Sequence, residues 1–304
     1  MTHAPDLVID LPVSQLVHFI AARFAEAGIA SPKSEAEWLV AGILGGNRSS
    51  LFLERGRKLS RGQQEQLKNF FIRRLQREPL QYIFGICEFY GYEFRVNTSV
   101  LIPRPETELL VEKVIALMRP SAQARIADLG TGSGCIAVTL AKELPGVRLL
   151  AADVSAEALQ VAGENAARQG VADRIEFRRV GMCEASVLET FDAVVSNPPY
   201  VLVAERSQLQ PEIREFEPEQ ALYIEGDGLK FYHCIVKFCE RHLKHGGWVA
   251  CEMASQRSAA ITQLFENFNF TNVEIIRDYA GLERHLVAQR AKRMEHDAKR
   301  IASR

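Results

Sequence analysis

Apolar residues recur at helical spacing through the first part of the chain. They form three groups separated by polar or glycine-containing stretches, which is the pattern of amphipathic helices that pack together. Ser34, followed by Glu35 and Glu37, favours the start of one helix, and Gly45-Gly46-Asn47 favours its end. We therefore expect a small helical bundle over the first 77 residues or so. The three groups are Leu16, Val17, Phe19, Ile20 and Phe24; Trp38, Leu39, Ile43 and Leu44; and Leu67, Phe70, Phe71 and Leu75.

The hydrophobic pattern changes after this region. Residues 88–96 alternate between apolar and polar positions around glycine and aromatic residues, which predicts a short β-hairpin. From Arg125 onward, strand-like apolar runs alternate with helical stretches, and this order predicts a mainly parallel sheet with crossover helices. The strand-like runs are 125–129, 148–152, 175–177, 193–195, 247–251, 273–276 and 285–288.

These patterns divide the chain into four parts. A helical domain over 1–78 precedes a linker with the hairpin over 79–99, an α/β domain over 100–290 and a charged tail over 291–304. A length of 304 residues and a hydrophobic content of 47% are enough for a core in each domain. The tail has no sustained apolar face, which favours a frayed helix or disorder.

Composition favours a soluble protein. No run of about 18 apolar residues is present, and the N-terminus lacks the regions of a signal peptide. We therefore expect a cytoplasmic protein without membrane contact. The six cysteines show no Cys-x-x-Cys spacing and no clustering with the seven histidines, so we expect reduced thiols and no metal site.

Basic residues gather between Arg48 and Arg77. Nine basic residues stand there against two acidic ones, a net charge of +7, although the whole chain carries −1. A solvated helix face is the ordinary meaning of such a segment. The functional alternative is a docking surface for an acidic partner domain or for RNA.

The most informative chemical signal is Asn197-Pro198-Pro199-Tyr200, directly behind the apolar run 191–196. Two prolines restrict φ and donate no backbone hydrogen bond, so the segment can neither extend the strand nor readily begin a helix. It offers two acceptors, the Asn197 side-chain oxygen and the Pro198 carbonyl, beside the flat Tyr200 ring. This set fits a planar –NH2 group, because each N–H can be donated to one oxygen. A Pro-Pro turn that only closes a strand is the structural alternative.

A second signal is a glycine loop between a strand-like run and an apolar helix. Its glycines let backbone approach a ligand closely, and the helix that follows offers unpaired N–H groups. A dinucleotide fingerprint would have glycine where the chain has Cys135, so hydride chemistry is disfavoured. Asp153 ends the next strand-like run, where a carboxylate can accept from both ribose hydroxyls. Loop, acid and Asn197 together predict a nucleoside cofactor beside an amine substrate. The loop consists of Gly130, Thr131, Gly132, Ser133 and Gly134.

These motifs resemble the class I S-adenosylmethionine-dependent methyltransferases, and within them the protein-glutamine N5-methyltransferases that modify peptide-chain release factors. The similarity covers residues 15–289. Residues 102–108 resemble the release-factor enzymes more than the related ribosomal-protein glutamine methyltransferases. Further segments with similar order and spacing are Glu78–Gly85, Phe89–Gly91, Val100–Glu112, Glu217-Pro218, Ala221-Leu222 and Asp227–Leu229.

The resemblance implies a Rossmann-like class I methyltransferase sheet, with the helical domain joined to it by the β-hairpin. It implies S-adenosylmethionine as methyl donor and S-adenosylhomocysteine as product. Release factors would be the partners, docked by the basic segment, with ribosome association as a further expectation and no sequence-specific nucleic acid contact. The implied residues are Asn197, Pro198, Pro199 and Tyr200 for catalysis; these with Arg104 and Glu106 for the substrate; and Gly130, Thr131, Gly132, Ser133, Gly134, Asp153, Met182 and Asn197 for the cofactor.

An amide nitrogen is a poor nucleophile because its lone pair is delocalised into the carbonyl, so such an enzyme must act mainly by positioning. Asn197 and the Pro198 carbonyl would hold the two N–H bonds and stabilise charge developing on nitrogen. Pro199 would enforce the loop shape, and Tyr200 would pack on the substrate side chain. We expect no catalytic histidine or cysteine.

Other functions share this chemistry. A DNA adenine-N6 methyltransferase could use the same loop on a flipped base, but the chain has no target-recognition region and is not basic overall. An RNA guanine-N2 or ribosomal-protein glutamine methyltransferase is closer. A cofactor-binding assembly protein without turnover is disfavoured by the intact Asn197 and Asp153. Met182 stands where relatives often carry an aromatic or polar residue, which predicts an apolar contact with adenine.

Overall fold

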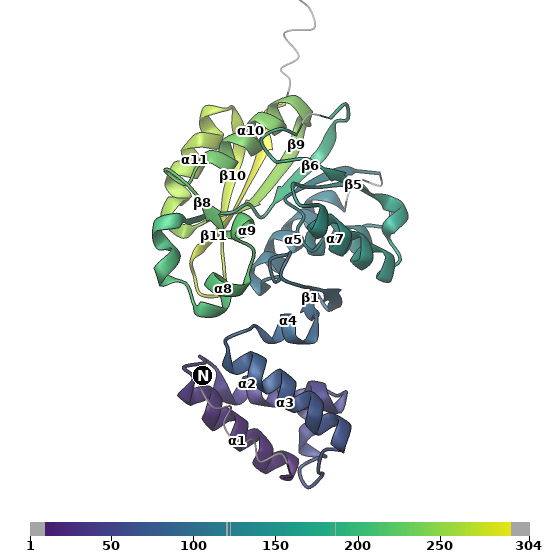
Figure 1. Ribbon diagram of the computed structural model, residues 1–304. Coiled ribbons are helices and arrows are strands. Elements are labelled where there is room, and N and C mark those ends of the chain that lie inside the picture. The colour runs from purple at the N-terminus through teal and green to yellow at the C-terminus, as the bar shows by residue number, and fades with distance from the viewer. Residues whose placement is uncertain (1–9, 120, 122, 186, 293–304) are drawn as a thin grey trace, which may run out of the picture. The chain divides into compact units, whose positions relative to one another are not determined.

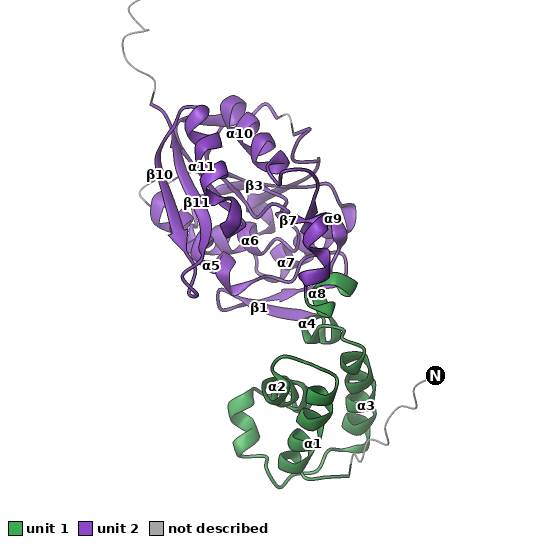
Figure 2. Ribbon diagram, turned by 90° about the vertical axis from the view of Figure 1, so that its left-hand side faces the viewer, with its two compact units in different colours: residues 1–85, 210–216 green, residues 86–209, 217–304 purple. Residues whose placement is uncertain are grey.

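A computed structural model of the chain describes residues 10–119, 121, 123–185 and 187–292, and it divides into two compact units. The helical unit contains the residues up to Gly85 together with residues 210–216. The sheet unit contains Ile86–Leu209 and the residues from Glu217 onward (Figure 2). The chain therefore leaves the sheet unit once and returns to it.

The helical unit confirms the predicted bundle. Its apolar faces meet in one core, where the rings of Phe24 and Phe71 stack at a centroid distance of 5.7 Å. Helix α2 begins at Pro32 rather than near Ser34, because proline suits the first helical position, and it ends before Gly45 at φ +74° as predicted. The helices are α1 Val13–Glu26, α2 Pro32–Leu44, α3 Arg61–Leu75, α4 Leu80–Phe84 and α8 Pro211–Phe216, with a 3₁₀ turn η1 over Arg48–Phe52 (Figure 1).

This unit differs from the predicted domain 1–78, because it extends to Gly85 and takes in α8. The reason is an ion-pair cluster. Arg74 is only 2% exposed and donates hydrogen bonds to Glu35 and to Glu212 of α8, and Arg77 also donates to Glu212. A contact between residues so far apart in the sequence leaves no local signal.

The sheet unit contains a seven-stranded sheet in the order β10-β11-β9-β6-β3-β4-β5. Pairs β3·β4, β3·β6, β4·β5 and β6·β9 are parallel, and β11 is antiparallel to both neighbours, which confirms the predicted mainly parallel sheet. The strands are β3 Arg125–Leu129, β4 Arg148–Asp153, β5 Ile175–Arg179, β6 Phe191–Ser196, β9 Leu243–Glu252, β10 Phe270–Arg277 and β11 Glu283–Arg290.

Helices cover both faces of this sheet. Buried residues of α5, α6 and α7 pack on one face together with the predicted hairpin, and buried residues of α10 and α11 pack on the other (Figure 1). The helices are α5 Pro105–Met118, α6 Cys135–Glu143, α7 Ala156–Arg168, α9 Glu219–Leu222, α10 Lys230–His242 and α11 Ser258–Asn267. The remaining strands are the hairpin, β1 Ile86–Phe89 and β2 Tyr92–Arg95, and the short pair β7 Val201–Leu202 and β8 Tyr223–Ile224.

One sequence prediction about cysteine is wrong. Cys183 and Cys234 form a disulfide, with their Cα atoms 4.8 Å apart and a sequence separation of 51. Cys183 lies in the loop after β5 and Cys234 in α10, so only the fold brings them together. The other four cysteines are thiols.

Two further expectations concern the ends of the chain and the membrane. The tail predicted over 291–304 lies, apart from its first two residues, outside the described residues. Among the helices that the structure describes, none is long and apolar enough to cross a membrane.

Candidate active site

A cavity of about 400 Å³ lies at the carboxyl ends of the central strands. Leu129 of β3 pairs with Ala152 of β4 and with Ser196 of β6, so the loops after these three strands lie side by side. They contribute Gly130–Ser133, Asp153 and Asn197 to the cavity wall, and Met182 lines it from the loop after β5. Ligands of open α/β sheets bind at this edge, where the strand order reverses. The structure thus brings both sequence motifs into one site.

The glycines of the loop have two roles, to adopt positive φ and to allow close packing. Gly130, Gly132 and Gly134 adopt φ of +78°, +55° and +78°, which side chains rarely allow. A Cβ on Gly134 would lie 2.9 Å from the Cβ of Ala162, so this glycine permits close packing against α7. Unlike the four residues before it, Gly134 does not line the cavity. Gly134 therefore has a role in shaping the loop, and its predicted contact with the cofactor stays a prediction.

Asp128, which was not among the predicted site residues, also shapes the glycine loop. Its carboxylate is fully buried and accepts a hydrogen bond of 2.6 Å from the hydroxyl of Thr131. Burial raises the pKa of Asp128 to about 7, against the smaller lowering effect of Thr131. An acid just before a glycine loop was the available signal.

Asp153 joins the loop to the second strand. Its Oδ2 accepts from the backbone N–H of Gly132 at 2.9 Å, and its Oδ1 accepts from that of Ser155 at 3.0 Å. The carboxylate is half-buried at the cavity wall, where further lone pairs can accept ribose hydroxyls. With the apolar Met182 side chain and the closely approachable glycine backbone, these residues fit the nucleoside part of S-adenosylmethionine.

The Asn197 loop follows β6 and contributes Asn197 and Pro199 to the cavity wall, whereas Pro198 and Tyr200 do not line the cavity. The Asn197 Nδ2 donates a hydrogen bond of 3.3 Å to the hydroxyl of Thr107, in the first turn of α5. The Tyr200 hydroxyl donates to Glu252 Oε1 at 3.0 Å. Burial, followed by the Glu252 charge, raises the pKa of Tyr200 above its ordinary value. Both polar side chains of the loop are thus anchored within the sheet unit.

Glu252 is the residue that the sequence analysis missed at this loop. It ends β9, is 1% exposed, and accepts from Tyr200 through Oε1 and from the Thr107 hydroxyl through Oε2 at 2.7 Å. Burial raises its pKa, opposed by these two hydrogen bonds and by Arg284. The signal that could have revealed it is an acid at the end of a buried strand, the same signal that revealed Asp153.

Arg104 and Glu106 flank the start of α5, as predicted from the proline and acid in its first turn. Arg104 lines the cavity and donates a hydrogen bond of 2.5 Å to Glu217, which is buried. Burial raises the pKa of Glu217, against the effect of Arg104. Glu106 does not line this cavity. Of the two, only Arg104 lines the cavity, and its contact with a substrate stays a prediction.

The arginines expected to dock a substrate have carboxylate partners within the helical unit. Arg73 donates to Glu78, and Arg74 and Arg77 share Glu212. Arg74 is buried and cannot reach a partner protein. Part of the positive charge of the basic segment is thus used to hold the helical unit together, and the docking role of the segment stays a prediction.

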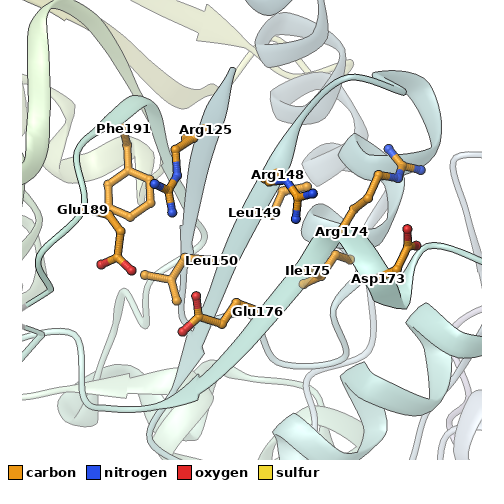
Figure 3. Close-up of a pocket in the computed structure, with 10 residues that line it drawn as sticks. All are labelled: Arg125, Arg148, Leu149, Leu150, Asp173, Arg174, Ile175, Glu176, Glu189 and Phe191. Carbon is orange, nitrogen blue, oxygen red and sulfur yellow. The ribbon is translucent and has the colours of Figure 1, made fainter. Parts of the chain in front are cut away.

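A second cavity, of about 170 Å³, lies at the opposite edge of the sheet (Figure 3). Arg125 and Arg148, the first residues of β3 and β4, line it together with Arg174, and the acids Asp173, Glu176 and Glu189 balance their charge. It contains none of the predicted site residues. Within the described ranges, moreover, no group of three or more His, Cys, Asp or Glu could hold a metal ion. The carboxyl edge is therefore the candidate active site.

Two segments of the chain match known protein families. Family models match for the PrmC N-terminal domain over residues 15–85 and for the methyltransferase small domain over residues 105–213. The catalytic domain of hMettl16, solved with the MAT2A 3′UTR hairpin 6, gives a TM-score of 0.53 at 17% identity, covering 76% of this chain and 83% of that one. This likeness shows the fold alone.

Curated relatives match over nearly the whole chain. The release factor glutamine methyltransferase of Chlorobaculum tepidum is 41% identical over 283 residues, which are 90% of this chain and 96% of that protein. The release factor glutamine methyltransferase of Geobacter sulfurreducens is 37% identical over 289 residues, which are 93% and 98%. The chain therefore belongs to the family of release factor glutamine methyltransferases, which use S-adenosylmethionine.

Proposed function

We propose that this enzyme methylates the side-chain amide nitrogen of the glutamine in the Gly-Gly-Gln segment of peptide chain release factors. One observation carries the proposal. The Asn197 Nδ2 is engaged by Thr107, which leaves the Asn197 Oδ1 as an acceptor in the cavity wall, and the Pro198 carbonyl belongs to the adjoining residue. Two neighbouring oxygens match the two N–H bonds of a primary amide. Family membership supports the choice of a release factor.

The protein promotes methyl transfer mainly by positioning the substrate amide nitrogen. Bound S-adenosylmethionine supplies an electrophilic methyl group. Asn197 Oδ1 and the Pro198 carbonyl accept the two N–H bonds, which orients the nitrogen and stabilises positive charge that develops on it. Pro198 is buried, and both prolines restrict the backbone, so these acceptors are held before the substrate arrives. The methylated amide loses its proton readily, so no strong base is required.

The cofactor is held by the other wall of the cavity. Gly130–Ser133 offer backbone close to the ligand, Asp153 accepts ribose hydroxyls, and Met182 packs on the adenine. Arg104, anchored by Glu217, is placed to contact the substrate. Tyr200 supports the loop through its hydroxyl, and its ring covers the substrate side chain.

The helical unit is the proposed docking surface for the release factor. Phe52 and Leu53, at the end of η1, are 71% and 91% exposed, and the Arg55 guanidinium lies 3.7 Å from the centroid of the Phe52 ring. An exposed apolar pair beside a cation is typical of a protein-binding surface. Release factors act on ribosomes, so we place the enzyme in the cytoplasm, acting on free or ribosome-bound release factor without sequence-specific nucleic acid contacts.

Replacing Asn197 by Ala tests this function. We expect turnover of a release factor to fall about a hundredfold or more, because the lost contact acts mainly in the transition state. Cofactor affinity, measured by calorimetry, should change much less. Asn267→Ala, at an exposed asparagine of α11, is the matched control and should keep full turnover. Unchanged turnover in Asn197→Ala would contradict the proposal.

A further inference from the structure

Glu252 and Asn197 are brought together by the pairing of two strands that are distant in sequence. Ser196 of β6 pairs with Cys251 of β9 in parallel register, so the residues that follow, Asn197 and Glu252, leave the same edge of the sheet side by side. Thr107 lies between them, in contact with both. The three side chains form one continuous hydrogen-bonded chain.

The direction of this chain is determined by what each group can donate. Thr107 has a single O–H, and it donates that hydrogen to Glu252 Oε2 at 2.7 Å. Towards Asn197 the Thr107 oxygen therefore has only lone pairs, so it accepts from an N–H, and Asn197 must turn its Nδ2 to it. The Asn197 Oδ1 is then directed to the cavity. Because the Glu252 carboxylate accepts at one end of the chain, Asn197 presents an acceptor to the cavity at the other end.

A second contact ties the same carboxylate to the other end of the loop. Glu252 Oε1 accepts from the Tyr200 hydroxyl at 3.0 Å, and the Glu252 backbone carbonyl accepts from the buried Tyr232 hydroxyl at 3.1 Å. Glu252 is thus held by α10 and in turn holds both ends of the four-residue loop. Such support is what keeps site residues within the narrow geometry that catalysis needs.

We propose that Glu252 is a positioning residue that selects an amide substrate by setting the orientation of the Asn197 amide through Thr107. The proposal rests on the proposed function, because it assumes that Asn197 accepts an N–H of the target glutamine. Glu252 itself does not line the cavity. It determines whether an acceptor or a donor faces the substrate.

The isosteric change Glu252→Gln makes the consequence measurable. The new side-chain –NH2 can donate to the Thr107 oxygen, and the Thr107 hydrogen then turns to Asn197. The Asn197 amide would rotate by half a turn and present Nδ2 to the substrate. Two N–H donors, the Asn197 Nδ2 and the –NH2 of a substrate glutamine, would then face each other. A glutamate carboxylate, which only accepts, would become the better partner.

The experiment uses two peptides, one containing Gly-Gly-Gln and one containing Gly-Gly-Glu, and measures their affinity by calorimetry with S-adenosylhomocysteine present. Wild type should prefer the glutamine peptide. In Glu252→Gln this preference should fall about tenfold or reverse, while kcat for the glutamine peptide falls at least tenfold and KM changes less. A merely structural role would weaken both peptides equally, and that outcome would overturn the proposal.

A threonine series keeps the test decisive if Glu252→Gln does not fold. Thr107→Val removes the link and should lower kcat about tenfold or more, and Thr107→Ser should restore most of it because the hydroxyl returns. Thr139→Val is the matched control: Thr139 is fully buried in α6, and its hydroxyl has no partner in the part of the chain that the structure describes. It should leave kcat unchanged.

Two failures are distinguishable. If wild type methylates neither peptide nor a release factor, the proposed function is wrong. If wild type methylates glutamine but Thr107→Val keeps its kcat and its peptide preference, the proposed function stands and the role of Glu252 is refuted.

Discussion

The Oδ2 atom of Asp153 accepts a hydrogen bond of 2.9 Å from the backbone N–H of Gly132. The acid at the end of one strand thereby holds the glycine loop at the end of its neighbour. The glycine loop and Asp153 are therefore one hydrogen-bonded structure, and the proposed contact with the ribose hydroxyls would be a second role of the same acid.

Asp153→Ala should consequently weaken cofactor binding by about 1 to 3 kcal/mol, the cost of losing hydrogen bonds to a charged group. Calorimetry with S-adenosylhomocysteine measures this directly. Asp173→Ala removes an exposed acid at the other edge of the sheet and should leave the affinity unchanged. Equal affinities of wild type and Asp153→Ala would disprove the ribose assignment.

Glu212→Gln should destabilise the helical unit. Arg74 is buried between Glu35 and Glu212, so loss of one carboxylate leaves a buried cation with half of its compensation. We expect a loss of about 2 to 4 kcal/mol in the free energy of unfolding. Glu215→Gln, which removes the exposed partner of Arg214, is the control and should cost less than about 1 kcal/mol. If the two variants unfold alike in denaturant, the Arg74 cluster does not anchor α8.

The disulfide predicts a specific count of reactive thiols. After denaturation without reductant, alkylation should modify four cysteines, and after reduction it should modify all six. Cys234→Ser should lower the free energy of unfolding by about 2 to 4 kcal/mol without reductant, since the closed loop restricts the unfolded chain. The same change should have little effect with reductant present. Six alkylated cysteines without reductant would contradict the pairing of Cys183 with Cys234.

His285 predicts how stability depends on pH. Burial, followed by the charge of Arg284, lowers its pKa from 6.5 to about 4. Between these values the unfolded chain binds a proton that the folded chain does not, so this residue causes stability to fall as the pH drops from 6.5 to about 4. Asp128, whose pKa is raised from 3.8 to about 7, acts in the opposite sense, since its contribution is lost as the pH rises from 3.8 to about 7.

The test of His285 is therefore a difference between two proteins. In His285→Leu, acidification from pH 6.5 to 4 should cost less unfolding free energy than in wild type, because the titrating group has been removed. Neither ring nitrogen of His285 has a hydrogen-bond partner among the described residues, although Nε2 lies 3.8 Å from Glu252 Oε2, so we expect an apolar replacement to fold. Parallel pH profiles of the two proteins would show that His285 does not titrate in this range.

Much of the site could be predicted because its parts follow strands. In a parallel sheet the carboxyl ends of all strands meet at one edge, so Gly130–Ser133, Asp153 and Asn197 had to converge. Short sequence motifs reveal them: glycines that tolerate positive φ, an acid at the end of a strand and a loop that contains two prolines. The helical bundle was predictable for the same reason, since its helices are amphipathic.

The supporting residues could not be predicted because they depend on long-range contacts. Glu252 reaches Asn197 only through the pairing of β6 with β9 and the position of Thr107, and local sequence patterns predict neither. Arg74 belongs to a basic segment whose pattern indicates surface charge, although tertiary packing buries it. In both cases the sequence shows the type of residue but not the residue with which it is in contact.

Mass spectrometry of a release factor treated with the enzyme and S-adenosylmethionine tests the central claim most directly. The account predicts a mass gain of one CH2, because a methyl group replaces a hydrogen on the side-chain nitrogen of the glutamine in the Gly-Gly-Gln segment. A release factor carrying glutamate at that position should stay unmodified, because a carboxylate would face the oxygens of Asn197 and Pro198. Methylation at any other residue, or of nucleic acid instead of protein, would contradict the account.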